Sequence, residues 1–289
     1  MKKLLYDIID YVRRLRYDYG LQASFDFSDI PAEHKEILLP YILHDNAYCT
    51  HIKKYNFFKC VSARRFAISK NPKAPYFGKC YAGVEEYVFP VIADGKTVNI
   101  VSISGYRTEN AKPPQFNKIA DRSKINSFTL EKTYYSLNTE IPELNDITSI
   151  VQPLVYMVKL YMLMLERVKI KNNAEETYPV AYNMILDYIA ENYKNNVSLL
   201  EIAEHCNFSV SRLSHIFKQY GHTSITQYLI KLKMIKAADL LLYTTANISQ
   251  IAAELGYNDP NYFSLQFKKY YGMSPKDYRK HNSTAQANP

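Results

Sequence analysis

The last hundred residues of the chain place apolar side chains at the period of an α-helix. Apolar positions recur at short helical spacings in two early runs, Ile185–Ile189–Tyr193 and Leu199–Ile202–Ala203–Cys206. Gly221, Gly256 and Gly272 each follow a periodic run, where a helix end favours a residue that tolerates positive φ. Ser198 and Ser249 precede two of the runs as candidate N-caps. This region therefore predicts a series of short helices.

The helical pattern occurs twice, about 50 residues apart. One copy runs from Leu200 to Lys218 and the other from Ser249 to Lys268. In each copy an Ile-Ala pair leads to a turn residue and an aromatic residue, and a second helix ends in Phe-Lys. This order is typical of a helix-turn-helix, whose second helix fits the major groove of DNA.

The run from Thr223 to Leu242 contains no Gly or Pro and predicts a helix of about 30 Å between the two copies. Two units about 34 Å apart would face successive turns of one groove. A plain helical bundle can produce one such copy. Two copies joined by a helix of this length favour DNA binding.

The first 140 residues differ, because Pro and Gly turns separate strand-like runs. Residues 87–92 and 97–104 flank the turn dipeptide Asp94–Gly95, which predicts a β-hairpin. Residues 1–19 and 31–43 are expected to be helices. We therefore expect an α+β sensor domain over residues 1–142, with an antiparallel sheet and helices. An all-α domain, with two helix-turn-helix units joined by a long helix, would follow over residues 178–281.

Residues 143–177 would connect the two domains. A heptad stripe of apolar residues makes this segment a candidate for dimerisation through Ile147, Ile150, Leu154, Met157 and Tyr161. Such a helix would either pair with a second copy in a homodimer or pack on its own N-terminal domain, and the spacing allows both. Residues 169–177 are expected to be a polar linker, and residues 282–289 a disordered tail.

Charge is distributed unevenly along the chain, whose formal net charge is +8. Residues 1–174 hold 25 Lys and Arg against 18 Asp and Glu, whereas residues 175–289 hold 11 against 10. Within the second part, two basic segments (205–238 and 260–289) alternate with acidic ones. Alternating charge also serves solubility, so it supports DNA binding only together with the motifs.

Composition excludes several classes of protein. Hydrophobic residues make up 47% and charged residues 22%, as in an ordinary globular protein. The most apolar run, residues 154–165, includes Lys159 and is shorter than the about 20 residues that span a bilayer. Asp7 and Asp10 interrupt a start that otherwise resembles a signal peptide, so we expect a cytoplasmic protein without membrane contact. The 4 Cys form no Cys-x-x-Cys pair, so we predict no metal site and no cofactor besides an effector.

Residues 180–281 closely resemble the DNA-binding domain of the AraC/XylS family of bacterial transcription regulators. The segment from Ile251 to Arg279 matches the family signature almost position by position. The resemblance implies recognition helices at residues 209–220 and 260–271. It places twelve residues at or near DNA: Ser209, Ser211, Arg212, Ser214, His215, Lys218, Asn261, Tyr262, Ser264, Leu265, Lys268 and Lys269.

These residue types suit different parts of DNA. Arg212 could pair bidentately with guanine or contact only phosphate, and Asn261 could pair with adenine. The lysines would contact phosphate, which gives affinity without sequence information.

Three features depart from the family pattern. His215 and Leu265 stand where the family often has a long polar residue, and Leu265 could touch a thymine methyl or contribute only packing. The segment Phe217–Gly221 is one residue shorter than Phe267–Gly272. We therefore expect the end of the first recognition helix to be tightened.

A weaker resemblance covers residues 80–107, which look like the PocR-type sensory domain, a PAS/GAF-like ligand module found beside AraC-type domains. Tyr81 stands for a His of that pattern, and Gly105–Tyr106 for a Gly-Gln pair. The resemblance implies an unidentified small-molecule effector. Candidate ligand residues are Cys80, Tyr81, Glu85, Glu86, Ser102, Ser104 and Tyr106. Cys49, Cys60 and Cys80 could line a pocket, respond to redox state or be structural.

Together these patterns favour a transcription activator that binds double-stranded DNA as a homodimer and responds to a small molecule. RNA polymerase is a partner implied by the family. The alternative is a constitutive DNA-binding regulator whose N-terminal domain serves dimerisation or partner binding. An enzyme of the alkyl-repair type fused to AraC-type domains is not expected, because the sequence contains no Pro-Cys-His-Arg stretch.

Overall fold

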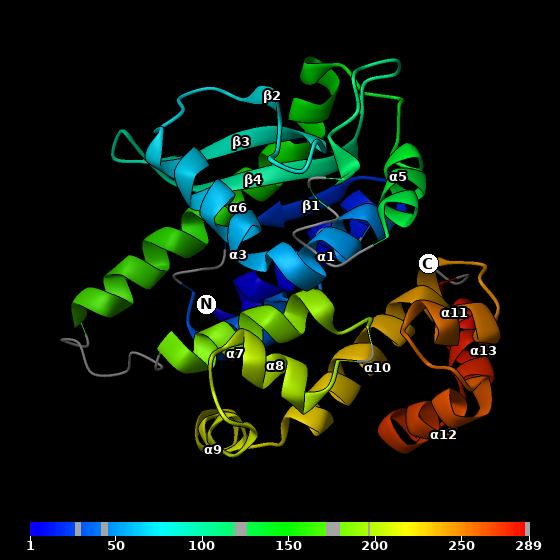
Figure 1. The fold of residues 1–289 in the computed structure, drawn as a ribbon. Helices are drawn as coiled ribbons and strands as arrows, with labels where there is room; N and C mark the ends of the chain where they lie inside the picture. Colours follow the sequence, from blue (N-terminus) through cyan, green and yellow to red (C-terminus); the bar gives the residue numbers. More distant parts are fainter. Residues whose placement is uncertain are drawn as a thin grey trace. The chain divides into compact units, whose positions relative to one another are not determined.

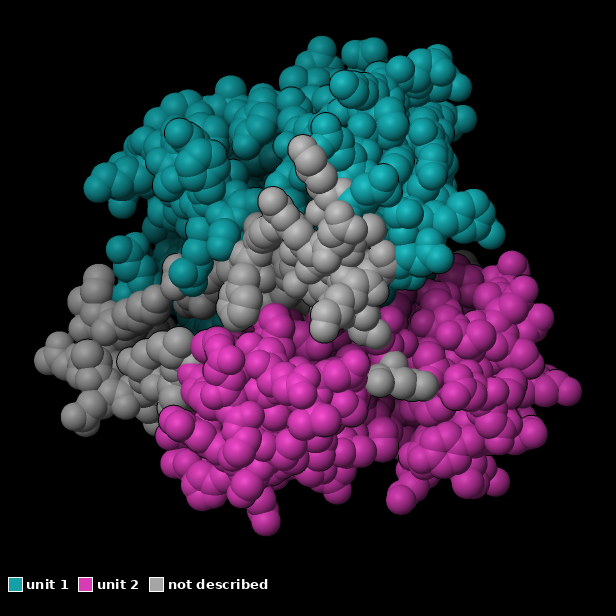
Figure 2. All heavy atoms as spheres, in the orientation of Figure 1, with its two compact units in different colours: residues 1–177 teal, residues 178–289 magenta. Residues whose placement is uncertain are grey.

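The computed structural model describes residues 1–26, 30–41, 46–117, 119, 126–171, 180–195 and 197–286. The chain divides into two compact units, unit 1 (residues 1–177) and unit 2 (residues 178–289), which are coloured separately in Figure 2. Each unit has its own buried apolar core.

Unit 1 is built on a four-stranded antiparallel sheet in the order β1-β4-β3-β2 (Figure 1). The strands are β1 (Gln22–Phe25), β2 (Tyr76–Lys79), β3 (Glu85–Ala93) and β4 (Lys96–Tyr106). The predicted hairpin is confirmed, because Asp94 and Gly95 join β3 to β4 with φ of 47° and 71°. Positive φ at both positions is what a two-residue type I′ turn requires.

Helices of unit 1 surround this sheet. They are α1 (Lys2–Tyr17), α2 (Ala32–Leu38), α3 (Ala47–Ser69), α5 (Ser127–Tyr135) and α6 (Leu144–Lys171). Helices α1 and α2 confirm the two expected near residues 1–19 and 31–43, of which residues 42–43 lie outside the described part. Helix α3 was not predicted. It begins at Asn46, whose side chain accepts a hydrogen bond from the Cys49 N–H at 2.8 Å.

The two faces of the sheet carry different side chains, because successive residues of a strand point to opposite sides. One face lies toward α6, where the Asn99 amide donates to Met162 Sδ at 3.6 Å and the Tyr87 hydroxyl donates to the Pro142 carbonyl. The other face lies toward α3, which packs on β4. This second face carries Glu86, Val88, Ile100, Ser102 and Ser104.

The heptad stripe of α6 faces unit 1 itself. Ile147, Leu154 and Tyr161 are buried there, and Ile150 and Met157 are half-buried. The Tyr161 hydroxyl lies 2.9 Å from His34 Nδ1. For the buried three, packing on the N-terminal unit is the arrangement observed, which is the second of the two that the spacing allowed. Most of the predicted linker, residues 169–177, lies outside the described part of the chain, which omits residues 172–179.

Residues Leu144–Arg167 of α6 are long and apolar enough to cross a membrane by composition, with a mean hydropathy of 1.4. A helix in a protein core passes the same test. Val151, Leu154 and Val158 are fully buried, and α6 packs on β3 and β4. The expectation that no segment spans a membrane thus meets one weak candidate among the described residues.

Unit 2 is all-α within its described residues. Its helices are α7 (Val180–Asn192), α8 (Leu199–His205), α9 (Val210–Gly221), α10 (Ile225–Tyr243), α11 (Ile248–Glu254), α12 (Pro260–Tyr271) and α13 (Pro275–Gln286). Helices α8–α9 and α11–α12 form the two predicted helix-turn-helix units, and α10 joins them (Figure 1). Ser198 caps α8 as predicted, through a capping box with Glu201. The cap of α11 is Asn247 rather than Ser249, which lies inside the helix.

The glycines confirm two predicted helix ends and correct a third. Gly256 and Gly272 have φ of 74° and 78°. Gly221 is instead the last residue of α9, and the left-handed cap is His222, with φ of 50°. Helices α9 and α12 are therefore both 12 residues long, and the expected tightening of the first is wrong. Of the predicted tail, residues 282–286 continue α13, and residues 287–289 lie outside the described part.

Candidate functional site

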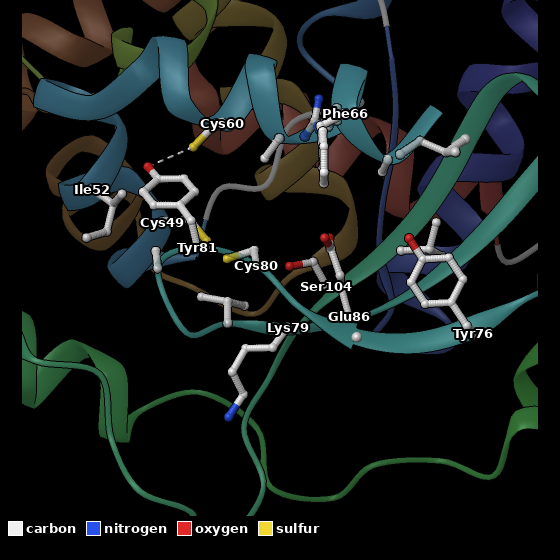
Figure 3. A pocket seen from close by; sticks show the side chains of 18 of the residues that line it. Cys49, Ile52, Cys60, Phe66, Tyr76, Lys79, Cys80, Tyr81, Glu86 and Ser104 are labelled. Atoms are coloured by element: carbon white, nitrogen blue, oxygen red, sulfur yellow. Dashed lines mark hydrogen bonds between the residues drawn. The ribbon is translucent and has the colours of Figure 1, made fainter. Parts of the chain in front are cut away.

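A pocket of about 360 Å³ lies between α3 and the sheet of unit 1 (Figure 3). Four of the predicted ligand residues line it: Cys80, Tyr81, Glu86 and Ser104. Most of the remaining wall is apolar and consists of Cys49, Ile52, Ala63, Phe66, Ala67, Ala82, Val84, Val88 and Ile100. This volume is at the small end of known small-molecule sites, which hold about 300–1,000 Å³.

A chain of hydrogen bonds crosses the pocket floor. The Arg64 guanidinium of α3 donates to Ser24 Oγ at 3.2 Å, and Ser24 Oγ lies 3.0 Å from Ser102 Oγ. Ser102 in turn is hydrogen-bonded to the Glu86 carboxyl. Burial raises the pKa of Glu86, and the nearby Arg64 charge and the Ser102 hydrogen bond oppose that rise. A titratable carboxyl is thus held in a mostly apolar cavity.

The other three predicted ligand residues do not line the pocket. The Glu85 carboxylate pairs with Lys79 Nζ at 2.9 Å and accepts from Thr108 Oγ1 at 2.7 Å. Burial alone would raise the pKa of Glu85, but these two partners lower it. Tyr106 is buried with its ring centroid 6.2 Å from that of Tyr87. Ser102 lies outside the lining and is hydrogen-bonded to the Glu86 carboxyl.

All three N-terminal cysteines of interest line the pocket and are free thiols. Cys60 Sγ lies 3.4 Å from the Tyr81 hydroxyl. Burial raises the pKa of the Cys80 thiol, so this group stays protonated and behaves as a soft apolar surface. Within the described ranges, no group of three His, Cys, Asp or Glu is placed to hold a metal ion.

Sequence reasoning missed the residues that α3 and β2 bring to this pocket. Arg64 and Phe66 come from α3, Lys70 is the C-cap of that helix, and Tyr76 comes from β2. The available signal was the absence of Gly and Pro between Pro40 and Pro72, which allows a long helix.

The first recognition helix, α9, presents the polar face that the sequence predicted. Leu213 and Phe217 are fully buried on its inner side. On its outer side the exposed residues are Ser211, Arg212, Ser214, His215 and Lys218. The Ser209 hydroxyl is the N-cap and accepts the Arg212 N–H at 3.2 Å. The Arg212 guanidinium lies 5.0 Å above the centre of the Phe208 ring, which orients it at the start of the helix.

The second recognition helix, α12, has the same division into faces. Phe263 and Phe267 are fully buried, and Asn261, Tyr262, Leu265, Lys268 and Lys269 are exposed. Leu265 is 64% exposed, so it contributes little to packing and is available to a thymine methyl. The hydroxyl of Ser264 is already engaged, because it donates to the Pro260 carbonyl at 2.8 Å.

Known proteins resemble this chain mainly through unit 2. Residues 202–281 match a family described as a helix-turn-helix domain. The lactose operon transcription activator of Staphylococcus xylosus is 35% identical over 98 residues, which cover 34% of this chain and 35% of that protein. The raffinose operon transcriptional regulatory protein RafR of Pediococcus pentosaceus is 29% identical over 154 residues, covering 52% and 53% of the two chains. The transcriptional activator RhaS of Escherichia coli O139:H28 is 27% identical over 135 residues, covering 47% and 48%.

The C-terminal region of the chain therefore matches helix-turn-helix domains of the AraC type. Among solved structures, the C-terminal domain of AraT, a response regulator from Geobacillus stearothermophilus, shares 36% identity over 37% of this chain and 88% of that domain, with a TM-score of 0.36. The family and these relatives are DNA-binding transcription regulators rather than enzymes. The chain spans between about a third and a half of the length of the curated relatives named above.

The geometry of the recognition helices in unit 2 suits contacts to both bases and phosphates. Each recognition helix offers one side chain able to form a bidentate pair near its first turn, Arg212 in α9 and Asn261 in α12. Basic residues lie in the last turn of each helix, with Lys218 in α9 and Lys268 and Lys269 in α12. Base recognition at one end and phosphate contact at the other are therefore chemically possible for both helices.

Proposed function

We propose that this protein is a ligand-controlled transcription activator that binds double-stranded DNA through α9 and α12. The observation that carries the DNA-binding part is the matched pair of recognition helices, each with a buried aromatic inner face and an exposed polar outer face. Relatives named as transcription activators support the direction of control. Because its target is the chromosome, the protein would act in the cytoplasm of a bacterial cell.

In this proposal the exposed residues of α9 and α12 divide into two roles. Arg212 and Asn261 read base edges, and Lys218, Lys268 and Lys269 hold phosphates. Ser209 and Ser264 act through the helix backbone, since their hydroxyls already have partners there.

The test selects a preferred duplex from a random pool with the full chain and measures its affinity at several salt concentrations. We expect Arg212→Ala to weaken binding to the selected duplex by roughly 5- to 150-fold, the value of about 1–3 kcal/mol for a bidentate base contact. Lys132→Ala, which removes an exposed charge from α5 of unit 1, is the matched control and should change little.

Two other outcomes carry information. If Arg212 contacts only phosphate, Arg212→Ala weakens selected and unrelated duplexes equally and lowers the salt slope by about 1. If the full chain prefers no duplex at all, sequence-specific regulation is contradicted.

For unit 1 we propose a sensory role in the manner of PAS/GAF-like modules, with the pocket between α3 and the sheet as the effector site. Ala67→Leu would fill part of this pocket. A reporter gene placed behind the selected duplex should then lose its dependence on growth conditions in this variant, while DNA affinity in vitro is retained. If wild type and variant drive the reporter alike under all conditions, the alternative is favoured, namely a constitutive regulator whose unit 1 serves dimerisation or partner binding.

A further inference from the structure

The pocket of unit 1 has a mostly apolar wall and a pair of polar side chains at its floor. Ile52 and Phe66 lie on the α3 side, and Val84, Val88 and Ile100 come from the sheet and the residues before it. Figure 3 shows Glu86 and Ser104 side by side at the floor, whereas the Tyr81 hydroxyl lies 3.4 Å from Cys60 Sγ in another part of the lining. These two residues are directly opposed in the β3–β4 register. A ligand would therefore contact apolar side chains over most of its surface, and at the pocket floor it would meet the polar groups of Glu86 and Ser104.

Ser104 is the polar residue in the lining whose hydroxyl is best placed to bond to a ligand. It is only 5% exposed and lines the pocket. Within the described part of the chain its hydroxyl has no hydrogen-bond partner, unlike the Ser24 and Ser102 hydroxyls, which bond to each other at 3.0 Å. The Ser104 hydroxyl borders the open space of the pocket, so a polar group that enters the pocket can replace water as its hydrogen-bond partner.

The charges at the pocket favour an uncharged ligand. Glu86 is the acidic residue in the lining, and burial raises its pKa, which favours its neutral form. The bordering cations already have partners in the fold: Lys79 pairs with Glu85 at 2.9 Å, Lys70 lies over the Phe66 ring and Arg64 donates to Ser24. Lys70 and Lys79 also border the pocket and would repel an ammonium group.

We propose that the pocket binds a small uncharged molecule with an apolar body and one hydroxyl group, such as a phenol or a small apolar alcohol. The body lies on Ile52, Phe66 and Val88. The ligand hydroxyl donates to the Glu86 carboxyl and accepts from the Ser104 hydroxyl. This inference deepens the proposed ligand control and rests on it.

A free sugar fits this pocket poorly. Most of its hydroxyls would lie against aliphatic and aromatic side chains, and each polar group buried without a partner costs free energy. The sugar operons named for two of the relatives therefore do not suggest the effector of this chain.

The experiment compares ring compounds that differ only in their polar group, with the full-length protein. Phenol, toluene, benzoate and benzylamine are titrated by calorimetry, with rhamnose as a sugar probe. We expect phenol to bind, and Ser104→Ala to weaken it roughly three- to tenfold, as expected for loss of one neutral hydrogen bond. Ser136→Ala, at the exposed C-terminal end of α5, is the matched control and should leave phenol binding unchanged.

Ala67→Leu establishes where the probe binds, because the larger side chain occupies the pocket. We expect it to abolish phenol binding, and an unaltered circular-dichroism spectrum and urea-unfolding curve of the full chain verify that unit 1 of the variant is folded. Stronger binding of benzoate, benzylamine or rhamnose than of phenol, lost in Ala67→Leu, overturns the inferred ligand class but leaves ligand control standing. Phenol binding that neither Ser104→Ala nor Ala67→Leu reduces, or no binding of phenol, overturns the inference. The reporter experiment with Ala67→Leu then decides on ligand control separately.

Discussion

The two helix-turn-helix units of unit 2 reach the same backbone geometry with different residues. In the first, the turn has Asn207 at φ of 56° and α9 ends at His222 with φ of 50°. In the second, the equivalent positions are Gly256 and Gly272, with φ of 74° and 78°. The first unit therefore places two residues with side chains in the left-handed region, where glycine is otherwise preferred.

The comparison extends to the aromatic residue that follows each turn. Phe208 lies beneath the exposed Arg212 of its own recognition helix, at 5.0 Å. Tyr257 instead lies near Lys233 Nζ of α10, also at 5.0 Å. Lys233 is buried, whereas Arg212 faces solvent. The first unit thus uses its aromatic to orient a DNA-facing group, and the second uses it to fix the turn to the core of the domain.

The largest difference between the units should appear at the second turn. A Cβ at Gly256 would lie 2.2 Å from the Lys194 carbonyl oxygen, whereas a Cβ at Gly272 would meet nothing within 4 Å. We expect Gly256→Ala to lower the free energy of unfolding by about 3 kcal/mol or more, from backbone strain and overlap together. Gly272→Ala should cost only the strain, about 1–2 kcal/mol. Urea unfolding of both variants tests this, and equal losses would contradict the close approach.

Lys233 of α10, beside the second turn, gives the domain a pH dependence in the alkaline range. Burial lowers the pKa of Lys233 to about 8. Between pH 8 and 10.5 the unfolded chain holds a proton that the folded chain has released, so this residue makes stability rise with pH, by at most about 1.4 kcal/mol per pH unit. Below pH 8 the folded protein carries the full cost of a buried charge.

Removing that charge should make the free energy of unfolding less dependent on pH. Lys233→Met should be more stable than wild type below pH 8, and the gap should close toward pH 10.5. Lys231→Met, at an exposed position two residues earlier on α10, should leave the pH dependence of stability unchanged. Parallel curves for wild type and Lys233→Met would show that Lys233 does not titrate in this window.

A smaller effect is expected at the end of α9. A Cβ at Gly221 would lie 2.6 Å from the Tyr182 hydroxyl oxygen. We expect Gly221→Ala to cost about 1–3 kcal/mol, although alanine is the better helix former by about 1 kcal/mol. In a Tyr182→Phe background the hydroxyl is gone and the same substitution should cost less. A double-mutant cycle measures the coupling, and additive effects would mean that the glycine is not required by Tyr182.

The smallest change should make the first turn resemble the second. Asn207→Gly relieves a left-handed side chain, and Asn is among the residues that tolerate this region best. We expect a change in stability of less than about 1 kcal/mol, with DNA affinity unaltered. A large loss would show that the Asn207 side chain has a structural role beyond the turn.

Unit 2 was largely predictable because its signals are local. Capping at Ser198, the Ile-Ala pairs and the buried Phe217 and Phe267 all lie within or beside the helices that they specify. The errors arose where a residue acts on a distant segment. Gly221 was expected at a left-handed helix end, but its role is to leave room for Tyr182, 39 positions earlier in the chain.

The pocket of unit 1 was only partly predictable for the same reason. The alternation in β3 and β4 correctly placed Glu86 and Ser104 on one face of the sheet, and both line the pocket. Glu85 and Tyr106 could not be excluded from the candidate ligand residues, since the strand pattern does not say which helix covers which face of the sheet. Arg64 and Phe66 reach the pocket from α3, and the tertiary packing of that helix is not encoded in any short motif.

The central claim is that the two recognition helices bind neighbouring segments of one DNA molecule. A hydroxyl-radical footprint of the full chain on its selected duplex tests it most directly. We expect two protected segments, roughly 10 base pairs apart, with Asn261→Ala weakening protection in the segment that α12 contacts. A single protected segment that is unchanged by Asn261→Ala would contradict a DNA-reading role for the second helix-turn-helix.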